Sequence, residues 1–142
     1  MSATAEAETN TIPHVPVKGG VVAYLQIDGA LKAADFYQRA FGAEKAMVMP
    51  PDDKGRTMHV HLYINGSSVM LSDPFPEHGC AAQEPQGFNL MLLVNDIDNQ
   101  FQRAVDAGAT PVMPPQDMFW GDRYGQVRDP FGVTWAMNQG KS

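Results

Sequence analysis

Apolar positions along this chain follow two different spacings, and the change between them predicts a strand followed by a helix. Residues 21–28, VVAYLQID, alternate as a half-buried strand does. Residues 29–43 have helical spacing instead, with Asp28 as the expected N-cap and Gly42 as the expected left-handed residue after the helix. The apolar face of this helix would contain Ala30, Ala33, Ala34, Tyr37, Ala40 and Phe41.

Three short strands are predicted after this helix. Their sequences are AMVM at 46–49, MHVHLYI at 58–64 and SSVMLS at 67–72. Asn65 and Gly66 separate the last two strands, and this pair is typical of a tight hairpin turn. The first half of the chain therefore has the predicted order βαβββ.

The second half repeats this order. Residues 88–94, FNLMLLV, are a predicted strand, and the helix that follows would begin at the N-cap Asp96 and end at Gly108. Two modules are expected, at about 19–73 and 86–138.

Smaller features support the duplication. The motif VMPP at 48–51 recurs at 112–115, and residues 129–132, DPFG, are a good turn with Pro second and Gly fourth. Aligning Gly66 with Gly132 places SSVMLS opposite VTWAMN. Neither module would bury its sheet alone, so the two should pair, either within the chain or between two chains.

Length and composition predict one domain with small-molecule or protein partners. The 142 residues are 44% hydrophobic, so the chain can bury a core at 19–142 after a flexible tail at 1–18. Its net charge of −6 argues against nucleic acid and anionic membranes as partners. Cys80 is the one cysteine, which excludes an intrachain disulfide or a Cys-based zinc site and favours the cytoplasm.

Several motifs together resemble the vicinal oxygen chelate superfamily, which includes glyoxalase I, extradiol dioxygenases and bleomycin-resistance proteins. These motifs are DFYQRAFGA at 35–43, VRDPFGVTW at 127–135 and the duplicated strand-helix-Gly-Ala pattern. MHVHLYINGSSVMLSD and FWGDRYGQVRDPFGVTW are most similar to the PhnB-like branch. The resemblance covers about residues 20–138 and implies an α+β fold, with two βαβββ modules pairing into a curved mixed sheet around a central cavity.

The resemblance also implies where a metal would bind. In the metalloenzymes of the superfamily, four His or Glu ligands lie on the first and last strand of each module. The matching positions here are Val22, Asn89, Met70 (or Ser72) and Ala136. Three of these side chains cannot bind a hard divalent ion and Asn89 alone is a poor ligand, so we expect no cofactor at the usual site.

His59 and His61 are the candidate catalytic residues and the alternative metal ligands. Strand alternation would place them with Tyr63 on the cavity side, while Val60, Leu62 and Ile64 face the helix. The spacing suits chelation, but the expected neighbours Tyr24, Gln26, Ser72 and Asn89 include no carboxylate; Asp73 and Glu77 would lie at the rim. Three roles remain open: metal ligands, a general base, or lining of a pocket.

The remaining candidates describe a pocket for an organic molecule. Arg123 in GDRYGQVRDP is a candidate partner for a carboxylate or phosphate, although a salt bridge with a neighbour such as Asp122 or Asp129 is the commoner explanation for such an arginine. The aromatic run MFWGDRYG would close over the cavity. The full predicted pocket is Tyr24, Gln26, His59, His61, Tyr63, Met70, Asn89, Met91, Phe119, Trp120 and Arg123.

These observations predict a cytoplasmic homodimer that binds a small organic molecule without the usual superfamily metal. A first alternative is a lyase, isomerase or dioxygenase that uses His59 and His61 with a divalent metal, or a metal-free acid–base catalyst. A second alternative is a non-catalytic accessory dimer. Fold resemblance supports all three, so the site has to decide between them.

Overall fold

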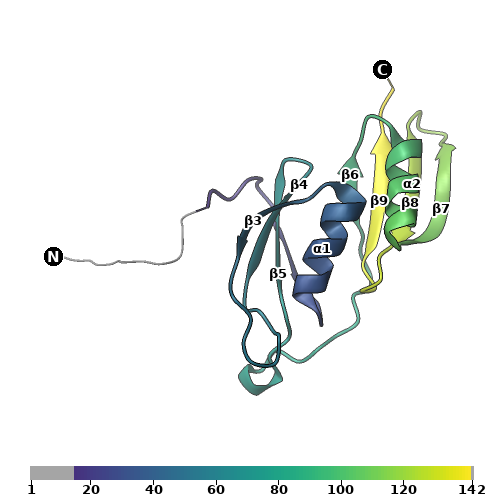
Figure 1. Ribbon diagram of the computed structural model, residues 1–142. Helices are drawn as coiled ribbons and strands as arrows, with labels where there is room; N and C mark the ends of the chain where they lie inside the picture. Colours follow the sequence, from purple (N-terminus) through teal and green to yellow (C-terminus); the bar gives the residue numbers. More distant parts are fainter. Residues whose placement is uncertain (1–14, 142) are drawn as a thin grey trace.

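The computed structural model describes residues 15–141, which form two modules of the same topology (Figure 1). The first module contains β2 (Ala23–Gln26), α1 (Ala30–Phe41), β3 (Glu44–Val48), β4 (Val60–Ile64) and β5 (Ser67–Ser72). The second contains β6 (Leu90–Leu93), α2 (Ile97–Ala107), β7 (Thr110–Asp117), β8 (Arg123–Arg128) and β9 (Thr134–Gln139). A short 3-10 helix, η1 (Pro76–His78), lies in the connection.

The two sheets have equivalent strand orders. The first sheet has the order β2-β5-β4-β3 and the second has β6-β9-β8-β7. In each sheet the first strand runs parallel to the last strand of its module, with Tyr24 opposite Met70 and Met91 opposite Ala136. The other neighbouring strands are antiparallel. The predicted α+β fold with two βαβββ modules is confirmed.

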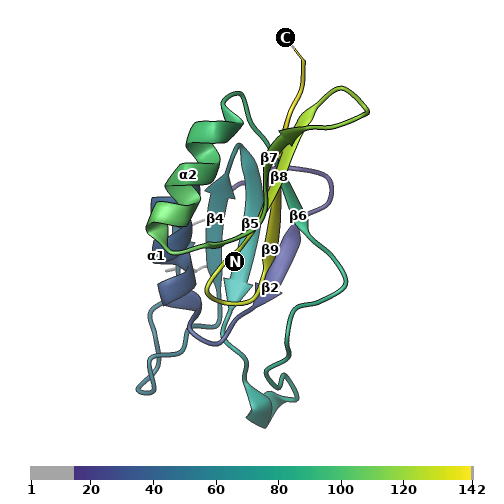
Figure 2. The same cartoon turned by 90° about the vertical axis from the view of Figure 1, so that its right-hand side faces the viewer.

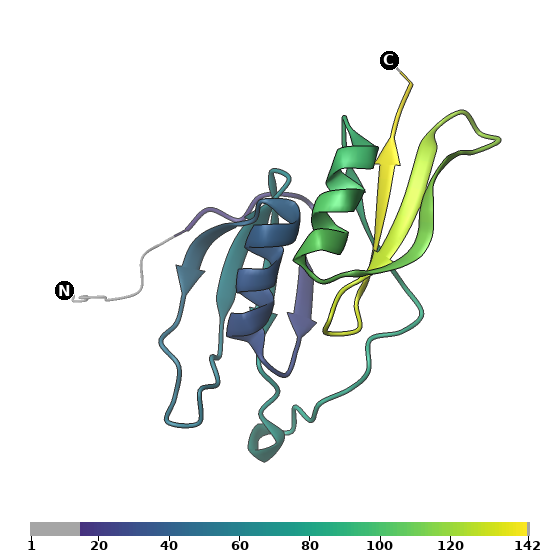
Figure 3. The same cartoon turned by 45° about the vertical axis from the view of Figure 1, so that its right-hand side comes forward.

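Both helices lie on one side of the sheets and share one core (Figures 2 and 3). Alternate strand residues face this core. Val60 and Leu62 do so as the sequence predicts, and Trp135 is buried with them. The Trp135 ring lies 5.2 Å from that of Tyr37, measured between centroids, so a residue of the second sheet packs directly on α1. The modules therefore pair within the chain. The opposite face of each sheet, called here the helix-free face, contacts neither helix.

The α1 N-terminus is capped by a distant residue, and the prediction that Asp28 is its N-cap is wrong. The N-cap is Gly29, in the left-handed region at φ 99°, and it offers no side chain to the helix. Asp73, directly after β5, accepts hydrogen bonds from the N–H groups of Gly29 (2.8 Å), Ala30 (3.2 Å) and Thr57 (2.8 Å). A buried carboxylate that is distant in the sequence thus replaces the local cap.

The other helix ends follow the sequence. Asp96 is the N-cap of α2, and its carboxylate accepts a hydrogen bond from the N–H of Asn99. Gly42 and Gly108 end the two helices with positive φ. Asn65 and Gly66 also have positive φ, as a tight hairpin turn requires.

Polar contacts connect α1 to the second module. Asp129, buried after β8, accepts hydrogen bonds from the Tyr37 hydroxyl and from Trp135 Nε1 (2.9 Å). Arg103 on α2 donates to the carbonyl oxygens of Arg39 (2.8 Å) and Gln38 (3.3 Å) at the C-terminal end of α1. The two modules are therefore held together by hydrogen bonds as well as by apolar packing.

The predicted tail at 1–18 lies mostly outside the described residues. Its last residues, 15–18, are described and lie along the first sheet, where the Lys18 N–H donates to Ser68 Oγ at 2.7 Å. Among residues 15–141, no helix is both long enough and apolar enough to cross a membrane.

Candidate functional site

The helix-free face of the first sheet carries both candidate histidines. Strand alternation along β4 turns His61 and Tyr63 away from the core, whereas Val60, Leu62 and Ile64 are buried against the helices. His59 precedes β4 on the same side. The two imidazoles nevertheless have different partners, which separates their possible roles.

His61 is held in a shielded position beneath the N-terminal segment. Its Nε2 lies 2.7 Å from Ser68 Oγ, which itself accepts a hydrogen bond from the Lys18 N–H. Because Ser68 Oγ can donate to Nε2 or accept from it, the tautomer of His61 decides the direction of this hydrogen bond. Burial, with a smaller contribution from the charge of His59, lowers the pKa of His61 below its ordinary value.

Residues 16–18, called here the cover, contact Tyr63 and Ser68 beside His61, which is only 2% exposed. The Tyr63 hydroxyl donates to the carbonyl oxygen of Pro16 at 2.7 Å, and Lys18 Nζ lies 4.0 Å from the centroid of the Tyr63 ring. His61 is therefore buried beside the cover rather than open to solvent.

His59 is more accessible and pairs with an aromatic side chain. Its Nδ1 lies 3.0 Å from the Tyr24 hydroxyl, and the two ring centroids are 5.7 Å apart. Tyr24 is 52% exposed, so this pair meets solvent. A tyrosine hydroxyl beside an imidazole can pass a proton, which gives the pair an acid–base capability.

The donor set does not fit the divalent metal of the superfamily's metalloenzymes. Met70 and Ala136 lie on β5 and β9, and Val22 and Asn89 directly precede β2 and β6. Asn89 is the one of the four with an oxygen or nitrogen in its side chain. Within residues 15–141, no three His, Cys, Asp or Glu side chains lie close enough together to hold a metal ion.

The two carboxylates expected at the rim are engaged elsewhere. Asp73 caps α1, as described above. Glu77 accepts hydrogen bonds from both terminal nitrogens of Arg56, at 2.7 and 3.1 Å, and this pairing lowers the pKa of Glu77 to about 2. Neither carboxylate is positioned as a third ligand for the histidines.

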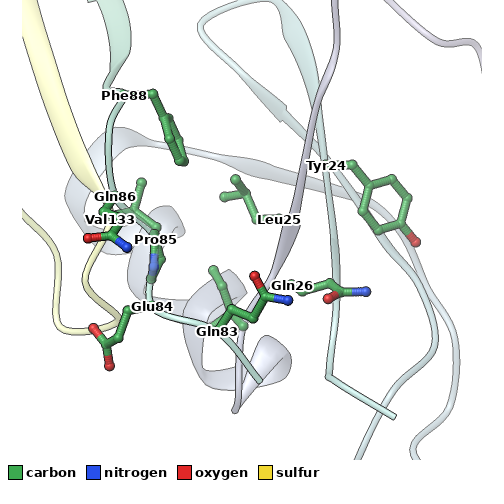
Figure 4. Close-up of a pocket in the computed structure, with 10 residues that line it drawn as sticks. Tyr24, Leu25, Gln26, Gln83, Glu84, Pro85, Gln86, Phe88 and Val133 are labelled. Atoms are coloured by element: carbon green, nitrogen blue, oxygen red, sulfur yellow. The ribbon is translucent and has the colours of Figure 1, made fainter. Parts of the chain in front are cut away.

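A pocket of about 510 Å³ lies beside β2 and the connecting segment 83–88 (Figure 4). Leu25, Ile27 and Val133 supply its apolar surface, and Tyr24 and Phe88 supply aromatic rings. Figure 4 shows the amide of Gln83 reaching toward Gln26, whereas Glu84 and Gln86 point away from β2. Glu84 is the one charged residue among those that line the pocket in the described chain.

This pocket contains two of the predicted site residues, Tyr24 and Gln26, and several that sequence reasoning missed. Gln83, Gln86 and Phe88 belong to the connection PFPEHGCAAQEPQG and the residue just beyond it. The connection has no strand or helix periodicity to indicate which side chains face the protein. The run of glutamines around Pro85 was the one available signal.

Other predicted site residues lie elsewhere. Met91, on the helix-free face of β6, is 52% exposed. Phe119, 96% exposed, and Trp120 lie at the tip of the β7–β8 hairpin, where Trp120 contacts Tyr124. Arg123 forms salt bridges with Asp98 (3.0 Å) and Asp117 (3.2 Å) rather than with its neighbours. None of these four residues lines the pocket beside β2.

Comparisons with known proteins agree on one family. The family model described as the Glyoxalase/Bleomycin resistance protein/Dioxygenase superfamily matches residues 17–137. An uncharacterized protein of Mycobacterium tuberculosis strain H37Rv is 40% identical over 131 residues, which cover 88% of this chain and 76% of that protein. An uncharacterized Arabidopsis thaliana protein is 32% identical over 118 residues, which cover 78% of this chain and 71% of that protein.

Solved structures share the fold. TioX from Micromonospora sp. ML1 is 28% identical with a TM-score of 0.66, and the match covers 87% of this chain and 98% of that one. A PhnB protein from Bacillus cereus, 16% identical, has a TM-score of 0.65 and covers 86% of this chain and 100% of that one. With the duplicated topology and the family match, these findings show that the chain belongs to the glyoxalase/bleomycin resistance protein/dioxygenase superfamily.

Proposed function

We propose that this protein binds a small neutral or cationic organic molecule in the pocket beside β2, without a metal. The supporting observation is the pocket itself. Its volume of about 510 Å³ lies within the range of about 300–1,000 Å³ that small-molecule sites occupy. Its apolar and aromatic surface, combined with a few amides, also has the usual character of such a site.

Charge argues against an anionic ligand. Glu84 contributes negative charge at the outer side of the pocket, and no Lys or Arg lines the pocket in the part of the chain that is described. Arg123, the sequence-based candidate for an anion, is neutralised by Asp98 and Asp117. A phosphate or carboxylate would therefore lack the charged partner that usually binds it.

The proposal includes a homodimer in the cytoplasm. Met91 and Leu93 expose apolar side chains on the helix-free face of the second sheet. A second copy that covers this face would remove them from water, which is the usual reason for such exposure. Sedimentation of the protein and of a Leu93→Glu variant tests this, because a dimer held by this face should dissociate in the variant.

Binding in the pocket is tested with neutral aromatic fragments, beginning with indole and benzamide. We expect amide chemical shifts of residues 83–88 and of β2 to move on titration. Phe88→Ala should weaken binding about tenfold, because it removes one of the two rings and about 1.4 kcal/mol of contact energy. Phe119→Ala is the matched control, since that ring is exposed on the distant hairpin. Chemical-shift changes confined to the β7–β8 hairpin, or an equal loss of affinity in the two variants, would refute binding in this pocket.

A second candidate function rests on the contact between Tyr24 and His59. A hydroxyl 3.0 Å from an imidazole nitrogen, at the solvent-exposed edge of the pocket, could act as a metal-free acid–base pair on a bound ligand. Once a ligand is known, its turnover by the unaltered protein and by Tyr24→Phe decides this. Binding without turnover would leave the protein as a binding module.

A further inference from the structure

Within residues 15–141, one edge of β2 pairs with no other strand, and this is called here its free edge. β2 pairs with β5 alone in the first sheet, and the hydrogen bond from the Ile27 N–H to the Ser72 carbonyl shows which groups face β5. Because backbone groups alternate along a strand, those of Ala23 and Leu25 share this direction. The N–H and C=O of Tyr24 and Gln26 therefore point away from β5, toward the free edge.

The free edge borders the pocket described above. Tyr24, Leu25, Gln26 and Ile27 all line it, and residues 83–88 form the opposite wall. Within residues 15–141, no backbone hydrogen bond joins this wall to β2. Two donors and two acceptors of the main chain are thus presented along one side of a groove.

Side chains in the groove can form the same kinds of hydrogen bond as the free main-chain groups of β2. The amides of Gln26 and Gln83 each provide both a donor and an acceptor, and Figure 4 shows Gln83 reaching toward Gln26. A ligand with its own amide groups can satisfy main-chain and side-chain partners together. An apolar molecule without such groups would leave them unpaired.

The groove continues past the end of β2 toward negative charge. A neighbouring pocket of about 470 Å³ shares Gln26, Ile27 and Gln83 with the first and adds Asp28 and Phe131. Glu84 lines both pockets. With no Lys or Arg among the described residues that line either pocket, this end of the groove favours a cation.

We infer that the ligand is an extended amide chain, a short peptide with a basic residue, which adds to the edge of β2 as a strand. Its backbone bonds Tyr24 and Gln26, and its cationic group approaches Asp28 and Glu84. Addition of a strand to an exposed sheet edge is an established mode of peptide recognition. The inference rests on the proposed function, because it specifies the ligand class of the same pocket.

The test uses the capped peptide acetyl-Val-Thr-Val-Lys-amide and an analogue in which esters replace its internal amides. We expect the peptide to shift the Tyr24 and Gln26 amide resonances and to slow their hydrogen exchange. The ester analogue, which lacks the N–H donors, should bind about fivefold or more weakly. This comparison uses the unaltered chain, so it does not depend on the folding of any variant.

Two substitutions of Gln26 distinguish the contribution of its main-chain N–H to peptide binding from the contribution of its side chain. Gln26→Pro removes the free N–H without removing a bond to β5, because edge positions of this kind tolerate proline. Gln26→Ala keeps the N–H and removes the amide side chain. We expect Gln26→Pro to weaken peptide binding more than Gln26→Ala does, with circular dichroism showing that both remain folded.

Three outcomes would overturn the inference. The peptide could fail to shift Tyr24 and Gln26, it could bind no better than its ester analogue, or Gln26→Pro could convert a dimer into a monomer, which would assign the edge to a second copy. Neutral aromatic fragments distinguish this failure from failure of the proposed function. If they bind in the pocket and the peptide does not, the pocket stands and strand addition is refuted.

Discussion

The Tyr37 hydroxyl of α1 donates a hydrogen bond to the buried carboxylate of Asp129 in the turn between β8 and β9. The same carboxylate accepts bonds from Trp135 Nε1 and from the N–H groups of Phe131 (2.9 Å) and Val133 (3.0 Å). One residue of the first module therefore completes the shell of a buried charge in the second. The loss of stability on removing the Tyr37–Asp129 hydrogen bond therefore reports how much each module stabilises the other.

Tyr37→Phe should lower the free energy of unfolding by about 1–3 kcal/mol, because it leaves one oxygen of a buried carboxylate short of a partner. Urea denaturation measures the change. Tyr124→Phe is the matched control. Tyr124 is half-buried, and the one bond of its hydroxyl within the described part of the chain is accepted from the Gln126 amide, so we expect a change within about 0.5 kcal/mol. Equal losses in the two variants would contradict a special role for Tyr37.

Alkaline pH should weaken the fold through the same residue. Burial, then the charge of Asp129, raises the pKa of Tyr37 well above the ordinary value of 10.0. A raised pKa stabilises the fold fully below the unfolded value and loses that contribution as pH rises above it. Stability of the unaltered protein should therefore fall more steeply above about pH 10 than that of Tyr37→Phe. Parallel curves from thermal melts would refute this.

Replacing each of the two aspartates near the start of α1, Asp73 and Asp28, should change the stability of the protein by very different amounts. Asp73→Ala removes a buried acceptor from three N–H groups and should cost about 2 kcal/mol or more. Asp28→Ala should change stability by less than about 0.5 kcal/mol, since Asp28 is exposed and does not cap the helix. Chemical denaturation of the pair decides the assignment. A larger loss of stability from Asp28→Ala than from Asp73→Ala would instead assign the cap of α1 to Asp28.

Deletion of residues 1–18 should raise the pKa of His61 toward its ordinary value of 6.5. The deletion removes the cover formed by Pro16 and Lys18, so water can solvate the charged imidazole. An NMR titration of the His61 ring in both proteins measures the change. Identical midpoints would show that the cover does not shield the ring.

Purified protein offered Zn²⁺, Fe²⁺, Mn²⁺ and Ni²⁺ should retain no stoichiometric metal in mass spectrometry. The nitrogens of His59 and His61 have separate partners, Tyr24 and Ser68, and among residues 15–141 no carboxylate completes a set of ligands with them. A His59→Ala, His61→Ala double variant is the control. One metal per chain that disappears in this variant would favour the metalloenzyme alternative.

Periodicity predicted the modules because each element buries one face. Strand alternation alone placed Val60 and Leu62 in the core and His61 on the other face, and the Asn65-Gly66 turn sets the register of β4 on β5. The cap of α1 could not be found this way, because it depends on the left-handed φ of Gly29 and on Asp73, more than forty residues away.

The site was harder to predict than the fold for a similar reason. Arg123 has partners in α2 and β7, which are neighbours only after folding. Gln83 and Phe88 come from an aperiodic connection, so no pattern indicates that they face β2. Local spacing predicts which face a residue occupies, but not which distant residue lies opposite.

The contacts between α1 and the second module have a consequence for synthesis of the chain. The ribosome completes the first βαβββ unit at residue 72. Tyr37 has no carboxylate partner until Asp129 has been synthesised, and the carbonyl groups at the end of α1 have no hydrogen bond from Arg103 until α2 has been synthesised. While more than fifty further residues are translated, α1 of the nascent first module therefore lacks the contacts that the second module later provides. Its final packing is a late event, which the C-terminal turn completes.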